Sequence, residues 1–205
     1  MMNVIRQINL RTRDILFSGL GLLFLSPFLL MIAIWIKIDS HGPVLFRGAR
    51  VGKGGKRFNI LKFRTMYEND SSYAGPKITG DGDPRITPAG KWLRDTKLNE
   101  LPQLWNVLVG EMSLVGPRPE DPAFVETWSE EVKAEILSIR PGITSPASVL
   151  YRDEEAMLSG TSPIDDYLGI IQPSKIRLDQ LYVRHRSMLV DLDVILWTFL
   201  VLVPG

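Results

Sequence analysis

The chain lacks cysteine and has only two histidines among its 205 residues. Without cysteine there is no disulfide framework, no thiolate metal site and no thiol nucleophile. His41 and His185 lie far apart, and neither stands in a metal-ligand spacing, which argues against a histidine metal centre and a Ser-His-Asp triad. The net charge is only +1, so composition does not indicate a nucleic-acid partner. The length suffices for one domain with a real core.

Charged residues are also absent from a long stretch near the amino terminus, between Ile15 and Ile36. This run exceeds the ~20 apolar residues that a membrane helix needs. A cleaved signal peptide fits less well, because the run is long and no small-x-small site follows it. The wholly buried helix of a soluble protein is the remaining alternative.

Ser26-Pro27 lies in the middle of this run, where proline removes a backbone donor and kinks or breaks a helix. Basic residues flank the run on both sides, and the positive-inside rule places both flanks in the cytoplasm. They are Arg6, Arg11 and Arg13 before the run and Lys37 after it. A helix that bends at Ser26-Pro27 and returns to the same face satisfies this rule. The residues alone leave this re-entrant helix and an ordinary kinked span equally open.

A second apolar segment, Val194 to Val203 with Trp197, ends the chain. It is too short to cross a bilayer but long enough to lie in its interface. A carboxyl-terminal core helix is the alternative interpretation.

Two short apolar runs, Val44–Phe46 and Phe58–Phe63, flank the turn residues Gly52-Lys-Gly-Gly55 and predict a β-hairpin. The hairpin is strongly basic, which suits an anionic lipid surface or a phosphorylated substrate, although a merely solvated ribbon would look the same. Its basic residues are Arg47, Arg50, Lys53, Lys56, Arg57, Lys62 and Arg64.

The remaining pattern is mainly helical, with helices predicted over 87–96, 100–109, 129–139 and 174–188. We therefore expect an α+β, mostly helical, single membrane-associated domain with a basic hairpin and amphipathic interfacial helices. Residues 1–38 would form the membrane helix and residues 39–205 the cytoplasmic catalytic part, as one structural unit.

A candidate site centres on Asn99-Glu100, which the pattern places at a helix amino terminus that would favour phosphate. Arginine forks bind phosphate bidentately, and Arg94, Arg118 and Arg140 lie before and after this helix. Glu100 offers a hard oxygen ligand for Mg²⁺. The bland alternatives are that Asn99 is a plain cap, that Glu100 is an ordinary first-turn acid and that Arg118 is a structural loop residue.

These motifs together resemble the bacterial sugar transferases, the monotopic phosphoglycosyl transferases, over nearly the whole chain. The motifs that carry the resemblance are the run broken at Ser26-Pro27, Lys62-Phe-Arg-Thr-Met66, Arg94, Leu98-Asn-Glu-Leu-Pro-Gln103, Asn106-Val-Leu108, Met112-Ser-Leu-Val-Gly-Pro-Arg-Pro119, Arg140-Pro-Gly-Ile-Thr144, and Leu178-Asp179 ahead of Tyr182-Val183. The resemblance implies a re-entrant helix with both ends in the cytoplasm, at the bacterial inner membrane.

The resemblance also implies the reaction. A nucleotide-diphosphate sugar, with uridine as the family default, and polyprenyl (undecaprenyl) phosphate are the implied substrates, and Mg²⁺ is the implied cofactor. Sugar-1-phosphate passes to the lipid through a covalent intermediate on an Asp, releasing UMP and starting glycan or exopolysaccharide synthesis. Glu100 is implied to hold Mg²⁺ or assist the nucleophile, and Lys62, Arg64, Arg94, Arg118 and Asp179 to lie in or near the site. The sugar and the oligomeric state, a homo-oligomer included, stay open.

The chain departs from the family where the nucleophile is expected, because that position holds Asn99. A neutral carboxamide is a poor nucleophile. Three explanations are open: Asn99 was introduced to trap an inactive form, the protein uses Glu100 or Asp95 instead, or it is a binding module that has lost catalysis. The competing functions are a catalytically silent membrane scaffold that binds donor or lipid, and a peripheral anionic-lipid binder with no nucleotide site.

Overall fold

The computed structural model describes residues 2–68, 79, 82–157 and 163–202. This part of the chain is mostly helical, as the sequence predicts, and contains two small sheets. Its helices are α1 Met2–Asp39, α3 Pro88–Asp95, α4 Gln103–Val109, α5 Pro122–Glu126, α6 Glu130–Ile136, α7 Pro146–Leu150, α8 Glu154–Met157, α9 Pro163–Asp166, α10 Gln172–His185 and α11 Met188–Leu202. The strands are β1 Leu45–Val51, β2 Arg57–Phe63, β3 Ser113–Val115 and β4 Gly142–Thr144.

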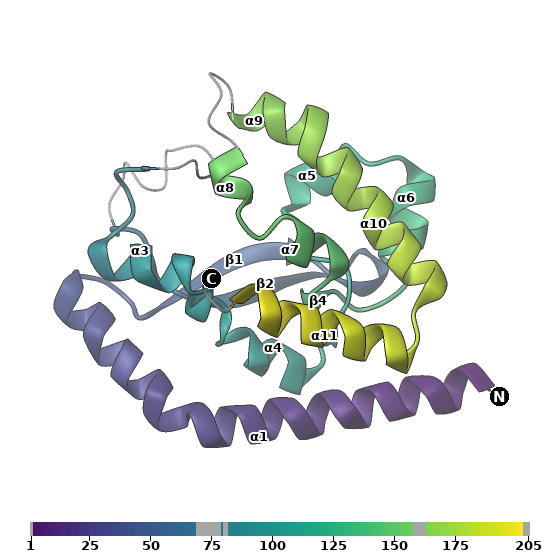
Figure 1. Cartoon of the computed structure of the whole chain (residues 1–205), viewed down its shortest axis with the longest axis horizontal. Helices are drawn as coiled ribbons and strands as arrows, with labels where there is room; N and C mark the ends of the chain where they lie inside the picture. The colour runs from purple at the N-terminus through teal and green to yellow at the C-terminus, as the bar shows by residue number, and fades with distance from the viewer. Residues whose placement is uncertain (1, 69–78, 80–81, 158–162, 203–205) are drawn as a thin grey trace.

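The longest element is α1, which runs along one edge of the molecule and bends before it reaches β1 (Figure 1). Proline cannot donate to the carbonyl four residues earlier, which here is that of Leu23. The Ser26 hydroxyl donates to this carbonyl at 2.7 Å instead. Pro27 therefore bends α1 without ending it, and the break expected at Ser26-Pro27 is a bend inside one helix.

Most of α1 is exposed. From Ile8 to Asp39 it is long and apolar enough to cross a membrane, with a mean hydropathy of 2.3 and only 11% of its most apolar stretch buried. This exposure is at odds with the alternative of a core helix. The second half of α1 is nevertheless anchored, because Ile32 and Ile36 pack with Phe63 and Leu93.

The carboxyl end of α1 is capped by a side chain from the end of the hairpin. The buried guanidinium of Arg64 donates to the carbonyls of Ser40 at 2.8 Å, of Ile36 at 3.4 Å and of His41. These groups include carbonyls that a helix end leaves without internal partners. Arg64 thus joins the end of β2 to the end of α1.

The two strands β1 and β2 pair antiparallel where the sequence predicts a hairpin, with Leu45 opposite Phe63 and Val51 opposite Arg57. One face of the hairpin packs through Ile60 on Val107 and Met112. The second sheet pairs β3 parallel to β4, with Ser113 opposite Gly142.

The helix predicted from residue 100 begins later than expected. Leu98–Glu100 forms a single 3-10 turn, in which the Glu100 amide donates to the Lys97 carbonyl at 3.1 Å, and α4 starts only after Pro102. Lys97 takes a left-handed conformation with φ of 58°. Asn99 is therefore inside a tight turn and is not the cap of a helix.

The carboxyl-terminal helix α11 is apolar and largely exposed, with Leu189, Phe199 and Leu200 each more than half accessible. Only Asp191 and Val194 of α11 are buried. A core helix would bury most of its apolar side chains, so this exposure favours the interfacial interpretation. Val203, at the end of the predicted segment, lies outside the described residues.

Candidate functional site

The functional candidate is a cavity of about 330 Å³ between the hairpin, the 3-10 turn and the loop that follows β3. Most of the residues singled out in the sequence line it, although they are widely separated along the chain. The predicted residues among its walls are Lys62, Arg64, Arg94, Asn99, Glu100 and Arg118.

Glu100 lies between two cations. Its Oε1 accepts from Lys62 Nζ at 2.8 Å and from Arg118 Nη2 at 2.7 Å, and Oε2 accepts from Arg118 Nη1 at 3.3 Å. The three side chains are mostly buried, with exposed fractions of 18%, 14% and 28% for Lys62, Glu100 and Arg118. Strand β2 supplies Lys62 and the Gly-Pro-Arg-Pro loop supplies Arg118, so the turn joins two separate elements.

These contacts set the protonation states. Burial alone would raise the pKa of Glu100, but the charges of Arg118 and Lys62 and their hydrogen bonds hold it well below its usual range. Burial lowers the pKa of Lys62 to about 8, although the charge of Glu100 opposes this. The charge of Glu100 raises the pKa of Arg118. At neutral pH the three groups form an ionised triad with one excess positive charge.

Asn99 also faces this cavity, but its side-chain oxygen lacks the hydrogen-bond donors that Glu100 has. Its side chain is 9% exposed, and its Oδ1 finds no hydrogen-bond donor among the described residues. Burying an amide oxygen without a partner is costly. Since the site does not satisfy this oxygen internally, it is free to accept a ligand.

Two further predicted arginines border the cavity and contact different groups. Arg94 comes from the last turn of α3, and its Nη1 donates to Thr65 Oγ1 at 3.3 Å. Arg64 also borders the cavity, but its guanidinium is engaged in capping α1.

Arg140 and Asp179 do not line the cavity. Arg140 Nε donates to the Gly110 carbonyl at 2.8 Å, at the carboxyl end of α4. Asp179 is buried on α10, and burial above all raises its pKa to about 7, with the negative charge of Glu120 adding to the rise.

Several lining residues had no sequence signal for this site. On α10, Lys175 pairs with Glu154 and lies 5.1 Å from the centre of the Tyr167 ring, whose hydroxyl donates to Glu120 at 2.8 Å. Arg50 also lines the cavity, although in the sequence it was only one of many hairpin cations. No motif reveals these contacts, because they join α10 to α8 and the segment Tyr167–Ile171 to the loop after β3.

A cationic cavity with an ionised triad beside an unsatisfied buried amide defines a protein suited to binding a phosphorylated ligand. The sequence profile described as "Bacterial sugar transferase" matches residues 5–205, so the chain belongs to the bacterial sugar transferase family. Its exposed apolar helix and this family membership indicate membrane association.

Named relatives agree with this family. The chain is 36% identical over 197 residues to the UDP-N-acetylgalactosamine-undecaprenyl-phosphate N-acetylgalactosaminephosphotransferase of Aeromonas hydrophila, covering 95% of this chain and 44% of the relative. It is 38% identical over 201 residues to the UDP-glucose:undecaprenyl-phosphate glucose-1-phosphate transferase of Klebsiella pneumoniae, covering 96% and 40%. The exopolysaccharide production protein PSS of Rhizobium leguminosarum bv. phaseoli is 36% identical over 198 residues, covering 92% of each chain. The chain spans less than half the length of the first two relatives.

Proposed function

We propose that this chain has the active site of an enzyme that transfers a sugar-1-phosphate from a UDP-sugar to undecaprenyl phosphate and releases UMP, and that Asn99 impairs this transfer. Two of the relatives carry names that state this type of reaction. The observation in the chain itself that carries the proposal is the Lys62–Glu100–Arg118 triad beside Asn99, inside a cavity also bordered by Arg94. Cations held in place by a carboxylate suit the diphosphate of a nucleotide sugar.

The proposed chemistry has two displacements on one phosphorus. With a carboxylate at position 99, as in Asn99→Asp, a carboxylate oxygen attacks the phosphorus bound to the sugar, an acyl-phosphate bond forms, and the bond to UMP breaks with its bridging oxygen leaving on UMP. An oxygen of the lipid phosphate then attacks the same phosphorus, and the carboxylate leaves unchanged. Lys62, Arg94 and Arg118 bind the phosphate oxygens and offset their charge.

The geometry supports a choice among three candidate positions for the nucleophile, residues 95, 99 and 100. Glu100 has both oxygens committed to cations, and its depressed pKa makes it weakly nucleophilic. Asp95 is exposed and does not line the cavity. Position 99 is buried, faces the cavity and leaves its oxygen without a donor. We therefore assign the nucleophile position to residue 99, which as Asn99 is neutral and unable to form the acyl-phosphate.

The residues fit a bound Mg²⁺. Among the described residues no group of three or more acidic or histidine side chains is placed to hold a metal, but Mg²⁺ usually takes one or two protein oxygens and completes its shell with substrate phosphates. Glu100 Oε2, with its one long contact, and the unsatisfied Asn99 Oδ1 are the oxygens suited to hold it. The bound ion would neutralise phosphate charge.

We further propose that α1 is a re-entrant helix, with its ends and residues 39–205 on the cytoplasmic side of the inner membrane. The bend at Ser26-Pro27 and the basic residues at both ends support this topology. The exposed apolar faces of α1 and α11 would then meet the same lipid layer.

A transfer assay decides the role of position 99. With labelled UDP-sugars and undecaprenyl phosphate, Asn99→Asp should raise the rate of transfer by about 10³-fold or more, the usual effect of a catalytic group. Equal and robust rates in both chains would remove residue 99 from the nucleophile role, and loss of that activity in Glu100→Ala would then favour Glu100. Mass spectrometry of Asn99→Asp with donor alone should reveal the covalent sugar-phosphate adduct.

The second candidate is a catalytically silent membrane scaffold that binds donor or lipid. The neutral Asn99 in an otherwise complete cationic site favours it. This function predicts that UDP binds to the chain, but that no transfer occurs even in Asn99→Asp. Turnover in the restored chain would exclude it.

A further inference from the structure

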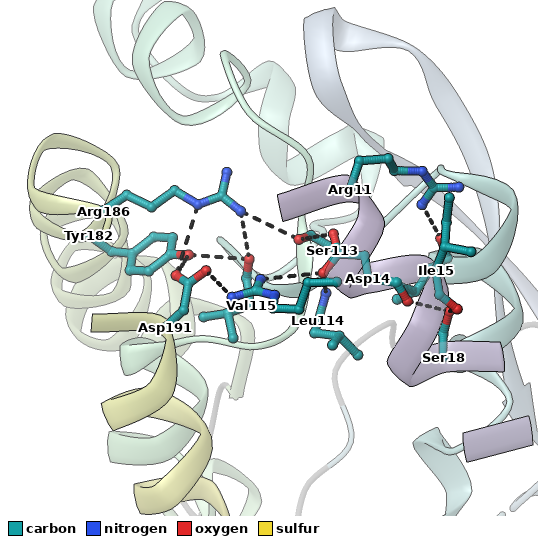
Figure 2. A network of polar contacts seen from close by, with 12 residues as sticks. Arg11, Asp14, Ile15, Ser18, Ser113, Leu114, Val115, Tyr182, Arg186 and Asp191 are labelled. Atoms are coloured by element: carbon teal, nitrogen blue, oxygen red, sulfur yellow. Dashed lines mark hydrogen bonds and ion pairs between the residues drawn. The ribbon is translucent and has the colours of Figure 1, made fainter. Parts of the chain in front are cut away.

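A second buried polar cluster lies outside the cavity, where α1, α10 and α11 meet the short strand β3. It contains Arg13, Asp14, Ser113, Tyr182, Arg186 and Asp191, which we call the Asp14–Asp191 cluster. Its two carboxylates are buried, with exposed fractions of 2% for Asp14 and 0% for Asp191. Figure 2 shows Ser113 to Val115 between Asp14 on one side and Tyr182 with Asp191 on the other.

Asp14 binds directly to β3. Its Oδ2 accepts from the Ser113 hydroxyl at 2.6 Å, and its Oδ1 accepts from the Leu114 backbone amide at 3.3 Å. The Ser113 amide donates toward β4, to the Pro141 carbonyl at 2.8 Å, so the next amide along the strand points to the other edge. Among the described strands, β3 pairs only with β4. Asp14 therefore supplies, on the free edge, an acceptor that a neighbouring strand would otherwise supply.

Asp191 of α11 connects this helix to α1 and α10 through its carboxylate. Its Oδ2 accepts from Arg13 at 2.7 Å and its Oδ1 from the Tyr182 hydroxyl at 2.6 Å, while Arg186 Nε lies 3.9 Å from Oδ1. The Tyr182 hydroxyl also lies 3.2 Å from the Val115 carbonyl, toward which it can donate. The last residue of β3 is thus held from the α10 side.

Only two residues separate the end of β3 from Arg118. Along that path the Gly116 amide donates to the Thr144 carbonyl at 3.0 Å and the Gly142 amide donates to the Pro117 carbonyl at 2.9 Å. A displacement of β3 would therefore move the loop and, with it, the guanidinium that contacts Glu100. Because β3 has three residues and one strand neighbour, side-chain bonds are a large part of what fixes it.

We propose that the Asp14–Asp191 cluster positions Arg118 for the donor diphosphate, so that Asp14 and Tyr182 are positioning residues for the reaction. The inference rests on the proposed function as far as the donor is concerned. The cluster joins the membrane helix, the interfacial helix and the substrate-binding loop. Its two carboxylates face two guanidiniums, from Arg13 and Arg186, so it brings little net charge into the interior.

The first test measures the loop itself by hydrogen exchange of the full chain in detergent or nanodiscs. Tyr182→Phe and Asp14→Asn should each speed exchange of the peptide covering 113–119 by about tenfold, because each removes part of the bonding of β3. The matched control is Glu135→Gln, which breaks the ion pair between α6 and Arg184 of α10 and should leave that peptide unchanged. Unchanged exchange in both cluster variants would overturn the proposal.

The second test uses UDP as the probe. The two variants should weaken UDP binding by about tenfold, since misplacement of a binding group by ~1 Å can cost up to ~100-fold. In an Arg118→Ala background the same changes should have no further effect, whereas a merely structural role would act equally in both backgrounds. A persistent full effect would overturn the proposal. Absence of UDP binding in the parent chain would instead count against the proposed function, and the exchange experiment would still decide the inference.

Discussion

Asn99 and Glu100 are neighbours in the 3-10 turn, but the hydrogen bonding of their side-chain oxygens differs. Glu100 accepts bonds from two cations, whereas the Asn99 oxygen has no donor among the described residues. A carboxylate at position 99 would lie beside a triad that carries one excess positive charge. That surplus would stabilise its ionised form, which is the form needed for attack on phosphorus.

Removing the charge of Glu100 should be costly near neutral pH. Glu100→Gln leaves Lys62 and Arg118 mostly buried without their counter-charge, so we expect a loss of about 3 kcal/mol in the free energy of unfolding. The folded pKa of Glu100 is depressed, so its stabilisation is present above the ordinary value of 4.5 and is lost as pH falls through the folded value. The difference between the two chains should therefore shrink in strong acid.

Thermal or chemical unfolding in one detergent, at pH 7 and near pH 3, measures this difference. Glu130→Gln is the matched control, because it removes a carboxylate from an exposed pair with Lys133, and it should cost at most about 1 kcal/mol. A loss for Glu100→Gln no larger than this control at pH 7 would contradict the expectation.

For residues that belong to recognisable motifs, the sequence predicted which side chains lie at the cavity. Lys62, Arg94, Glu100 and Arg118 come from four separate elements, and the structure brings them to one cavity. Arg140 has an equally suggestive setting, Arg-Pro-Gly, yet it bonds to the end of α4. A loop arginine beside proline can bind phosphate or a helix carbonyl, and only the packing of the loop decides between them.

At the scale of elements, the main error concerned where α4 begins. Pro102 has no backbone donor, and the turn before it closes with 3-10 bonds, so the residues from Leu98 to Glu100 do not join the helix. The pattern of apolar residues does not reveal this, because a 3-10 turn and the first turn of a helix bury similar positions. The bend in α1, in contrast, follows directly from Ser26-Pro27.

Helix α3 approaches the end of the hairpin so closely that only glycine fits at residue 90. A Cβ on Gly90 would lie 2.1 Å from the Thr65 carbonyl oxygen, which is backbone and has little freedom to move. Gly90→Ala should push α3 away from the hairpin and so displace Arg94, which lies one turn after residue 90. The change should lower the free energy of unfolding by about 3 kcal/mol. The melting temperature and the affinity for UDP should both fall.

Gly169→Ala provides the comparison for this change. A Cβ there meets no atom within 4 Å, and the residue lies in the helical segment Tyr167–Ile171. Replacing a helical glycine with alanine should raise stability by up to about 1 kcal/mol. Equal melting temperatures of the two variants would show that the close approach of α3 to Thr65 is not required for stability.

At the scale of the molecule, the direction of α1 relative to the membrane is open to a direct test, because the chain has no cysteine of its own. The single-cysteine variants Asn3→Cys and His41→Cys place a label at the start of α1 and just after its end. A re-entrant helix predicts that a membrane-impermeant maleimide labels both from the cytoplasmic side only. Labelling of the two positions from opposite sides of the membrane would establish a spanning helix.

The Arg64 cap has a consequence for how the molecule responds to its lipid surroundings. A helix that sits in a bilayer adjusts its tilt when the hydrocarbon layer becomes thinner or thicker. The far end of α1 is bonded to Arg64, which directly follows β2, and Lys62 lies two residues earlier on that strand. We therefore predict that a change in acyl-chain length alters the spacing between Lys62 and Glu100 in the cavity.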